Sequence, residues 1–151
     1  MHLVPHAKSN KDPGDDDGAL ADRLAAEFPK AVRVPNFADP SAAKAHISSL
    51  DLLVGGRMHA CIGAFSAGTP VVPVAYSRKF SGLFGLLGYE AMVPVTGLDL
   101  EGVMDFVRAA AADRATLSQR IAAGMAKVTD LLDVYRDELR RAFAVAAERR
   151  R

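Results

Sequence analysis

The stretch Asp51-Leu-Leu-Val-Gly-Gly-Arg-Met-His-Ala60 decides the expected fold, because a short apolar strand runs into two glycines and then into a helical pattern. In α/β proteins this arrangement places the free N–H groups of a helix N-terminus at the end of a strand, where they can bind an anion. Arg57 and His59 follow the glycines directly. The stretch therefore predicts a parallel strand, a tight turn and an anion site at the carboxyl end of that strand.

Apolar strands and helical patterns alternate on both sides of this stretch. Strands are expected at residues 2–5, 31–34, 51–54, 70–75 and 91–95, and helices at 17–28, 40–50, 57–67, 81–87 and 98–112. Asp39 and Pro40 supply an N-cap and a first helical residue, and Gly68 followed by Pro70 ends the third helix. The alternation predicts the α/β class, with a Rossmann-like, doubly wound parallel sheet.

Apolar residues at helical spacing predict which face of each helix is buried. On the shorter helices these faces consist of Leu20, Leu24 and Phe28; of Met58, Cys61, Ile62 and Phe65; and of Leu100, Val103, Met104 and Val107.

A long helix that no strand follows is expected after residue 113, with an interruption near Gly124. Its apolar stripe consists of Leu117, Ile121, Met125, Val128, Leu132, Tyr135, Leu139 and Phe143. Such a stripe must cover another surface, and part of that surface would lie on a domain outside this chain. The expected division is therefore a Rossmann-like domain over residues 1–112 and a C-terminal helical extension over residues 113–151.

The composition argues against several classes of protein. The 151 residues are half hydrophobic and carry a formal net charge of +1, so no nucleic-acid or membrane-surface partner is indicated. No signal peptide or transmembrane segment is expected, and the location predicted is cytoplasmic. The one cysteine, Cys61, falls in an apolar helical pattern that is typical of a small buried residue.

Metal and cofactor motifs are absent from the sequence. It contains no zinc-ligand spacing, no P-loop, no Gly-x-Ser-x-Gly and no Gly-x-Gly-x-x-Gly. The run Asp15–Asp17 favours a helix start through the helix dipole more than it favours a bound metal. We therefore predict no cofactor and no metal site.

The candidate site centres on Gly55-Gly-Arg-Met-His59. The two glycines, Gly55 and Gly56, let the backbone turn sharply and approach a ligand closely. Arg57 can bind a carboxylate or phosphate through two parallel N–H bonds, and His59 can donate a hydrogen bond or move a proton near neutral pH. The alternative is a plain turn with a surface arginine and a histidine that caps a local group.

A second block, Tyr76-Ser-Arg-Lys-Phe80, follows the strand expected at 70–75 and would face the same crevice. Its candidate ligand-binding side chains are Tyr76, Ser77 and Lys79, and the alternative is a solvated turn. His6 ends the first expected strand and could face the crevice, although a lone histidine there is more often structural.

Together these blocks resemble the polysaccharide pyruvyl transferase family. The resemblance is carried by Asp51–Ala60, by Phe65-Ser-Ala-Gly-Thr-Pro-Val-Val72, by Ala75–Phe80 and by Leu87-Gly-Tyr89, in matching order and spacing. The first residues, His2-Leu-Val-Pro-His6, and the acidic run 15–17 resemble the start of that family's C-terminal half. The resemblance extends over residues 1–110, and the Arg-Met-His block is its most specific part.

The resemblance implies an enzyme that transfers a pyruvyl group from phosphoenolpyruvate to a sugar or polysaccharide acceptor as a cyclic ketal, in exopolysaccharide or cell-envelope glycan synthesis. It implies two Rossmann-like domains arranged as in GT-B glycosyltransferases, of which this chain would be the donor-binding half. It also implies that Arg57 and His59 contact phosphoenolpyruvate, with Gly55, Gly56 and Met58 beside them.

The resemblance implies members much longer than these 151 residues, with an N-terminal domain that would help to hold the acceptor and that we expect to be missing from this chain. We therefore expect little or no transferase activity unless a missing N-terminal domain or a partner, such as a second copy of the chain, completes the cleft. Two other functions stay open: the nucleotide-sugar-binding half of a GT-B glycosyltransferase, and a non-catalytic remnant domain that associates through its long helix.

Overall fold

The computed structural model describes residues 1–8, 16–94 and 96–148. They form a mixed α/β protein with parallel strand pairs and a long C-terminal helix, as the sequence predicts. The chain divides into two compact units, Met1–Val74 and Ala75–Arg151.

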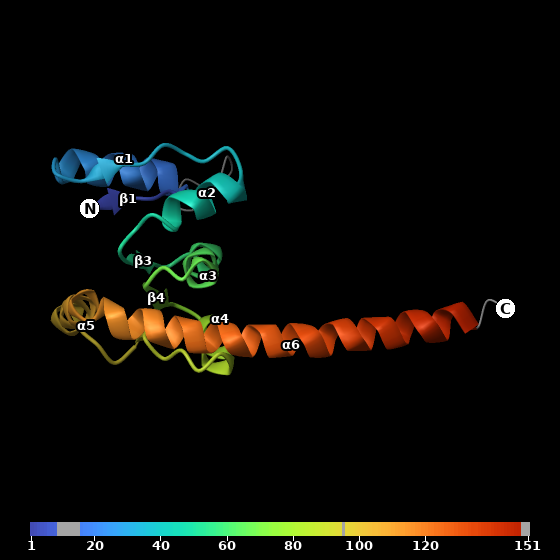
Figure 1. The fold of residues 1–151 in the computed structure, drawn as a ribbon. Coiled ribbons are helices and arrows are strands. Elements are labelled where there is room, and N and C mark those ends of the chain that lie inside the picture. Colours follow the sequence, from blue (N-terminus) through green and yellow to red (C-terminus); the bar gives the residue numbers. More distant parts are fainter. Residues whose placement is uncertain (9–15, 95, 149–151) are drawn as a thin grey trace. The chain divides into compact units, whose positions relative to one another are not determined.

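The first unit alternates strands and helices. Its elements are β1 (His2–Leu3), α1 (Asp17–Glu27), β2 (Val32–Arg33), α2 (Pro40–Ile47), β3 (Leu53–Gly55), α3 (Met58–Ala67) and β4 (Val71–Ala75), whose last residue begins the second unit. β1 pairs with β2 in parallel, and β3 pairs with β4 in parallel, with Leu53 opposite Val71. Helix α1 contacts β1 and β2, and α2 contacts α3 (Figure 1).

Local sequence signals define the ends of these helices. The Asp39 side chain accepts a hydrogen bond from the backbone N–H of Ala42, and Pro40 is the first residue of α2. Gly68 ends α3 in the left-handed conformation, at φ 79°. Both caps are confirmed. The core between the elements of this unit includes Ile47, Phe65 and Val72.

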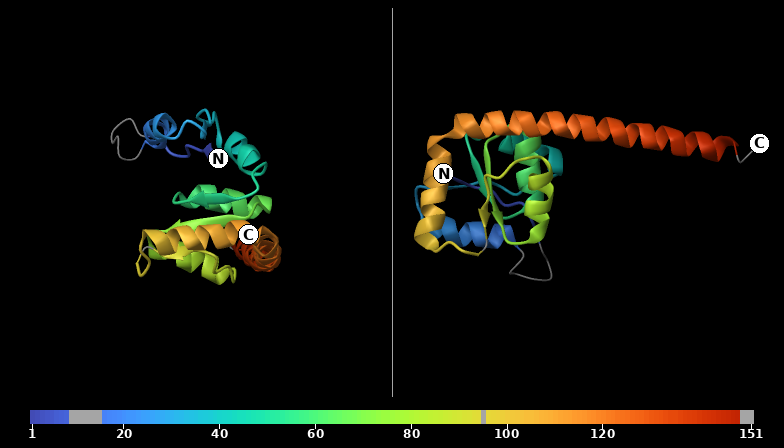
Figure 2. Two further views of the ribbon diagram at one scale, coloured as in Figure 1. Left: turned by 90° about the vertical axis from the view of Figure 1, so that its left-hand side faces the viewer. Right: turned by 90° about the horizontal axis from the view of Figure 1, so that it is seen from below.

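The second unit contains α4 (Arg78–Leu86), β5 (Val93–Pro94), α5 (Leu100–Ala112) and α6 (Arg114–Glu148). Its core includes a cluster of rings, in which Phe80 stacks on Phe84 with centroids 6.4 Å apart and Tyr89 lies tilted against Phe84 with centroids 6.0 Å apart. The interruption predicted near Gly124 is wrong, because α6 is one continuous helix (Figures 1 and 2). Gly124 is buried, and the helix continues through it.

Three of the predicted buried faces are only partly correct. On α1 the buried residues are Gly18 and Ala21, whereas Leu20 and Phe28 are 45% and 49% exposed, because small residues let this helix approach β1 and β2 closely. On the other two helices, the exposed members of the predicted faces are Ile62, Leu100 and Met104.

The apolar stripe of α6 is buried only near its beginning. Leu117 and Ile121 are buried, and the exposed members of the stripe are Leu132, Tyr135, Leu139 and Phe143. In the right-hand view of Figure 2 the C-terminal half of α6 extends beyond the other elements of the second unit. Among the described residues, no helix combines the length and the apolar character that a membrane crossing requires.

Candidate anion-binding site

The candidate site lies in the first unit, where β3 leads into α3. Gly55 is the last residue of β3, and Arg57 is the N-cap of α3, with an extended backbone at φ −87° and ψ 118°. The helix begins one residue later, so exposed His59 lies in its first turn. This is the strand–turn–helix order that places backbone N–H groups and a cation at one point.

The two glycines of the turn are not required by backbone geometry. Neither Gly55 nor Gly56 has a positive φ, so neither position demands glycine on conformational grounds, and their role in a close approach of a ligand stays a prediction. A Cβ atom on Gly55 would lie 3.4 Å from Sγ of Cys61, whereas one on Gly56 would meet no described atom within 4 Å. Gly56 therefore borders open space on the side where a side chain would stand.

Cys61 supports this turn from beneath. It is fully buried, and its Sγ donates to the carbonyl oxygen of Gly55 at 3.2 Å. Burial raises the pKa of the Cys61 thiol to about 12, which leaves the sulfur protonated and a poor nucleophile. The prediction of a small buried residue is confirmed.

The carboxylate of Asp17, the first residue of α1, binds the guanidinium of Arg57. Oδ1 accepts from Nε at 3.1 Å and from Nη2 at 2.9 Å. Oδ2 accepts from the backbone N–H groups of His6 at 3.0 Å and Ala7 at 2.8 Å. Asp17 thus joins three segments: the residues that follow β1, the start of α1 and the start of α3.

These bonds keep Asp17 ionised. Burial alone would raise the pKa of the Asp17 carboxyl. The hydrogen bonds from Arg57, Ala7 and His6, together with the charge of Arg57, outweigh burial and hold the pKa below its ordinary value. Side-chain exposure is 19% for Asp17 and 35% for Arg57, so the pair is partly shielded from water and its Arg57 end is still accessible.

The His6 imidazole lies within the electrostatic influence of this ion pair and of His59. Burial is the main cause that lowers the pKa of the His6 imidazole; the charge of Asp17 raises it, and those of His59 and Arg57 lower it further. The ring is therefore neutral near pH 7. Its Nδ1 is buried and has no hydrogen-bond partner among the described residues. Sequence reasoning had favoured a structural histidine here.

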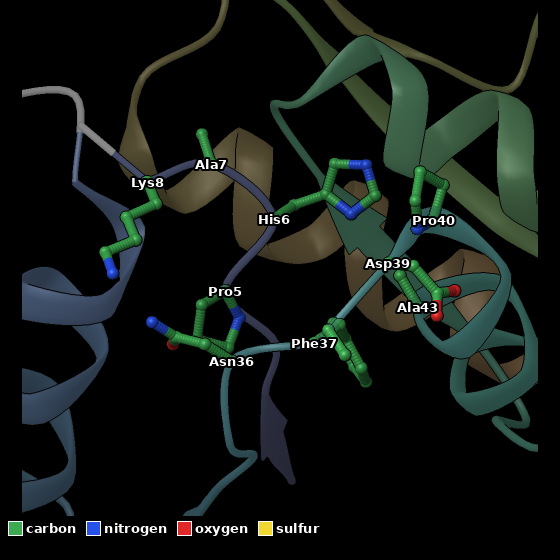
Figure 3. Close-up of a pocket in the computed structure, with 10 residues that line it drawn as sticks. Pro5, His6, Ala7, Lys8, Asn36, Phe37, Asp39, Pro40 and Ala43 are labelled. Atoms are coloured by element: carbon green, nitrogen blue, oxygen red, sulfur yellow. The ribbon is translucent and has the colours of Figure 1, made fainter.

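A cavity of about 290 Å³ opens beside His6. Figure 3 shows the His6 ring extending toward Pro40 and Asp39 at the start of α2. Lys8, Asn36 and Phe37 also line the cavity. The described residues that line the cavity do not include Arg57 or His59. The cavity therefore adjoins the charged cluster through His6, with the carboxylate of Asp39 at one side.

The remaining predicted site residues belong to the second unit. Tyr76 is exposed and its ring meets Phe80 edge-on, with centroids 5.4 Å apart. Ser77 is the N-cap of α4 without a side-chain capping bond, and exposed Lys79 lies in the first turn of α4. Their part in a common site with Arg57 stays a prediction.

The acidic run shows which site residue the sequence reasoning missed. Asp15 lies outside the described residues, while Asp16 accepts from the backbone N–H of Gly18 as the N-cap of α1. Asp17 was interpreted only as a residue that favours a helix start. An aspartate in a first turn carries no sequence signal that would assign it a partner 40 residues away.

The family model for polysaccharide pyruvyl transferases matches residues 1–78, which is just over half of the chain and includes the complete Gly-Gly-Arg-Met-His block. The match ends before Lys79 and the Leu87–Tyr89 block, although both belong to the resemblance seen in the sequence. No curated protein matches the chain.

Proposed function

Because the chain belongs to the polysaccharide pyruvyl transferase family, we propose that it is the donor-binding part of a transferase that moves a pyruvyl group from phosphoenolpyruvate onto a sugar as a cyclic ketal. The acceptor class is a polysaccharide or its sugar precursor, as the family description implies. The fold proposed is the Rossmann-like half of a GT-B-like architecture, acting in exopolysaccharide or cell-envelope glycan synthesis.

One observation carries this proposal: inside the matched residues, an arginine that is ion-paired to a carboxylate caps a helix whose first turn carries an exposed histidine. Arg57 is held by Asp17, with Nη2 2.9 Å from Oδ1, and His59 follows it in the first turn of α3. Phosphoenolpyruvate carries a phosphate and a carboxylate, so its binding requires cations and backbone N–H donors. Gly56, which borders open space, would let the donor approach the backbone.

The proposed reaction starts with a proton. An acid protonates the methylene carbon of the enol, which leaves positive charge on the carbon that bears the phosphate oxygen. A sugar hydroxyl attacks that carbon and loses its proton. The carbon–oxygen bond to phosphate then breaks, inorganic phosphate leaves, and a second hydroxyl closes the ketal with loss of its proton. His59 is the proposed acid or phosphate ligand, and Arg57 the proposed anion ligand.

A thermal-shift experiment tests the proposal. The chain is melted with phosphoenolpyruvate, a nucleoside diphosphate or inorganic phosphate, since a ligand that binds only the native state stabilises it by mass action. We expect phosphoenolpyruvate to raise the melting temperature most, and we expect Arg57→Lys to abolish that preference, because lysine keeps the charge but not the planar pair of donors.

The same thermal-shift experiment includes a control variant and distinguishes the alternative functions. Arg108→Lys, which changes an arginine of α5 whose side chain is 67% exposed, should leave the phosphoenolpyruvate shift unchanged. A larger response to the nucleoside diphosphate would favour the glycosyltransferase half instead. Equal responses to all three phosphates, or none, would refute donor binding.

A further inference from the structure

We propose that Asp17 is a positioning residue for the anion site, which fixes the direction in which Arg57 presents its guanidinium to the bound anion. The inference rests on the proposed function and adds a residue to the same site. Asp17 itself need not touch the donor.

The carboxylate is well suited to hold another side chain still, because it is itself held on both sides. Oδ2 accepts from two consecutive backbone N–H groups, those of His6 and Ala7, and the Asp17 backbone N–H donates to the carbonyl oxygen of Ala7 at 3.0 Å. Asp17 also begins α1. Its oxygens therefore have little freedom to follow Arg57 if that side chain moves.

The Arg57 contact fixes orientation as well as position. Nε and Nη2 both donate to Oδ1, and Nε also lies 3.3 Å from Oδ2. A planar guanidinium that meets a carboxylate through two N–H groups loses rotation about its side-chain bonds. A donor anion would then find the cation already oriented, at a lower cost in side-chain entropy.

Two effects of Asp17 on a bound anion have opposite signs, which makes the proposal testable. The negative charge of Asp17 repels an anion, so its removal by itself would tighten binding. Orientation of Arg57 favours the anion, so removal of the carboxylate would weaken binding. Solvent reaches both side chains and screens the repulsion, so we infer that orientation is the larger effect.

The experiment is a calorimetric titration of the full chain, first with phosphoenolpyruvate and then, on a separate sample, with inorganic phosphate. In Asp17→Asn the amide keeps one acceptor oxygen and places an NH₂ donor among the N–H groups that the carboxylate had accepted. We expect its dissociation constant for phosphoenolpyruvate to be about tenfold higher than that of the wild type. In the Arg57→Lys background the same change should have little further effect, since the two residues act as a unit.

Asp22→Asn is the matched control. Asp22 also lies on α1 and also pairs with an arginine, Arg33, at 2.8 Å, but its side chain is 66% exposed. This variant removes the same charge and should leave both dissociation constants within about twofold of the wild type.

A second measurement separates positioning from a merely structural role. In nitrogen-15 NMR spectra, the Arg57 Nε–H proton should exchange slowly with water in the wild type, and about tenfold faster in Asp17→Asn at a temperature where both proteins are folded. If Asp17→Asn does not fold, Asp17→Glu, which keeps the charge but displaces the carboxylate, takes its place in both measurements.

The outcomes distinguish the two proposals. If phosphoenolpyruvate binds no better than inorganic phosphate, but both bind more weakly to Asp17→Asn, the donor assignment fails and the positioning role stands. If Asp17→Asn binds phosphoenolpyruvate as tightly as the wild type or more tightly, or lowers only the melting temperature, the positioning role fails alone. If neither anion binds the wild type, both fail.

Discussion

At the scale of single residues, Asp17 and His6 illustrate how one neighbourhood favours deprotonated groups. The pKa of the Asp17 carboxyl is lowered because hydrogen bonds and the charge of Arg57 outweigh burial. The pKa of the His6 imidazole is lowered chiefly by burial. An ionised carboxylate and a neutral imidazole are therefore the forms that the folded chain stabilises near pH 7.

This predicts a specific pH dependence of stability. In the unfolded chain His6 takes up a proton near its ordinary pKa of 6.5, whereas in the folded chain it does so at lower pH. Its contribution to the free energy of unfolding is therefore complete above pH 6.5 and is lost as the pH falls through the folded pKa. We expect the free energy of unfolding, measured in urea from pH 7.5 to 4.5, to decline less steeply in His6→Gln.

The matched control is His46→Gln, which removes a histidine whose ring stacks on His2, at a centroid distance of 5.4 Å, outside this cluster. A decline that stays as steep in His6→Gln as in the wild type would contradict the prediction. Asp17 acts in a separate window, because a carboxyl with a lowered pKa loses its contribution only below its ordinary value of 3.8.

The sequence identified Arg57 and His59 as candidates for the site, but not the carboxylate that holds Arg57. Gly-Gly-Arg-Met-His is a contiguous signal, since the turn and the helix start are set by neighbouring residues. The Asp17–Arg57 pair joins residues 40 apart and depends on how α1 lies relative to α3. No periodicity or spacing carries that information.

At the scale of elements, helix α3 depends on the glycine that caps its C-terminus. Gly68 has φ 79°, and a Cβ atom there would meet no described atom within 4 Å. The cost of a side chain at this position is therefore one of backbone conformation alone. We expect Gly68→Ala to lower the free energy of unfolding by about 1 kcal/mol, measured by urea denaturation.

Gly63, inside the same helix, supplies a control of opposite sign. An added Cβ there would lie 3.9 Å from the Ile47 side chain, an ordinary contact. Gly63→Ala should raise the free energy of unfolding by about 0.5–1 kcal/mol, since alanine favours the helix. A loss of stability in Gly63→Ala, or none in Gly68→Ala, would contradict this account.

Helix ends were predicted well because caps depend on a few adjacent residues, as at Asp39 and Gly68. Helix faces were predicted less well. On α1 the four-residue spacing of Leu20, Leu24 and Phe28 marked a face whose first and last members are exposed, whereas the buried residues of the helix are the small Gly18 and Ala21. Apolar spacing reports which residues could be buried, but not which neighbour is present to bury them.

At the scale of the whole molecule, α6 divides into a buried beginning and an exposed remainder. Ile121 is 1% exposed, whereas Phe143 is 71% exposed. We expect Ile121→Ala to lower the free energy of unfolding by about 2–5 kcal/mol. Phe143→Ala should change it by less than about 0.5 kcal/mol, because an exposed ring loses little burial. Urea denaturation at low protein concentration measures both.

The same measurement at higher concentration shows whether the exposed stripe is covered in solution. A destabilisation by Phe143→Ala that grows with protein concentration would contradict the prediction, because it would indicate burial between copies of the chain. The sequence identified the stripe from its spacing alone. The spacing of apolar residues in α6 does not indicate which other surface, if any, buries the stripe.

The three-way junction at Asp17 has a consequence for the order in which the protein is assembled. His6, Asp17 and Arg57 are separated along the chain by 11 and 40 residues, so their meeting requires the closure of long loops. Contacts of such sequence separation carry a large entropic cost and slow the folding of the chains that depend on them. In a nascent or partly folded chain Arg57 would thus be present but not yet oriented by Asp17. Binding of an anion would therefore indicate that the first unit had reached its native topology.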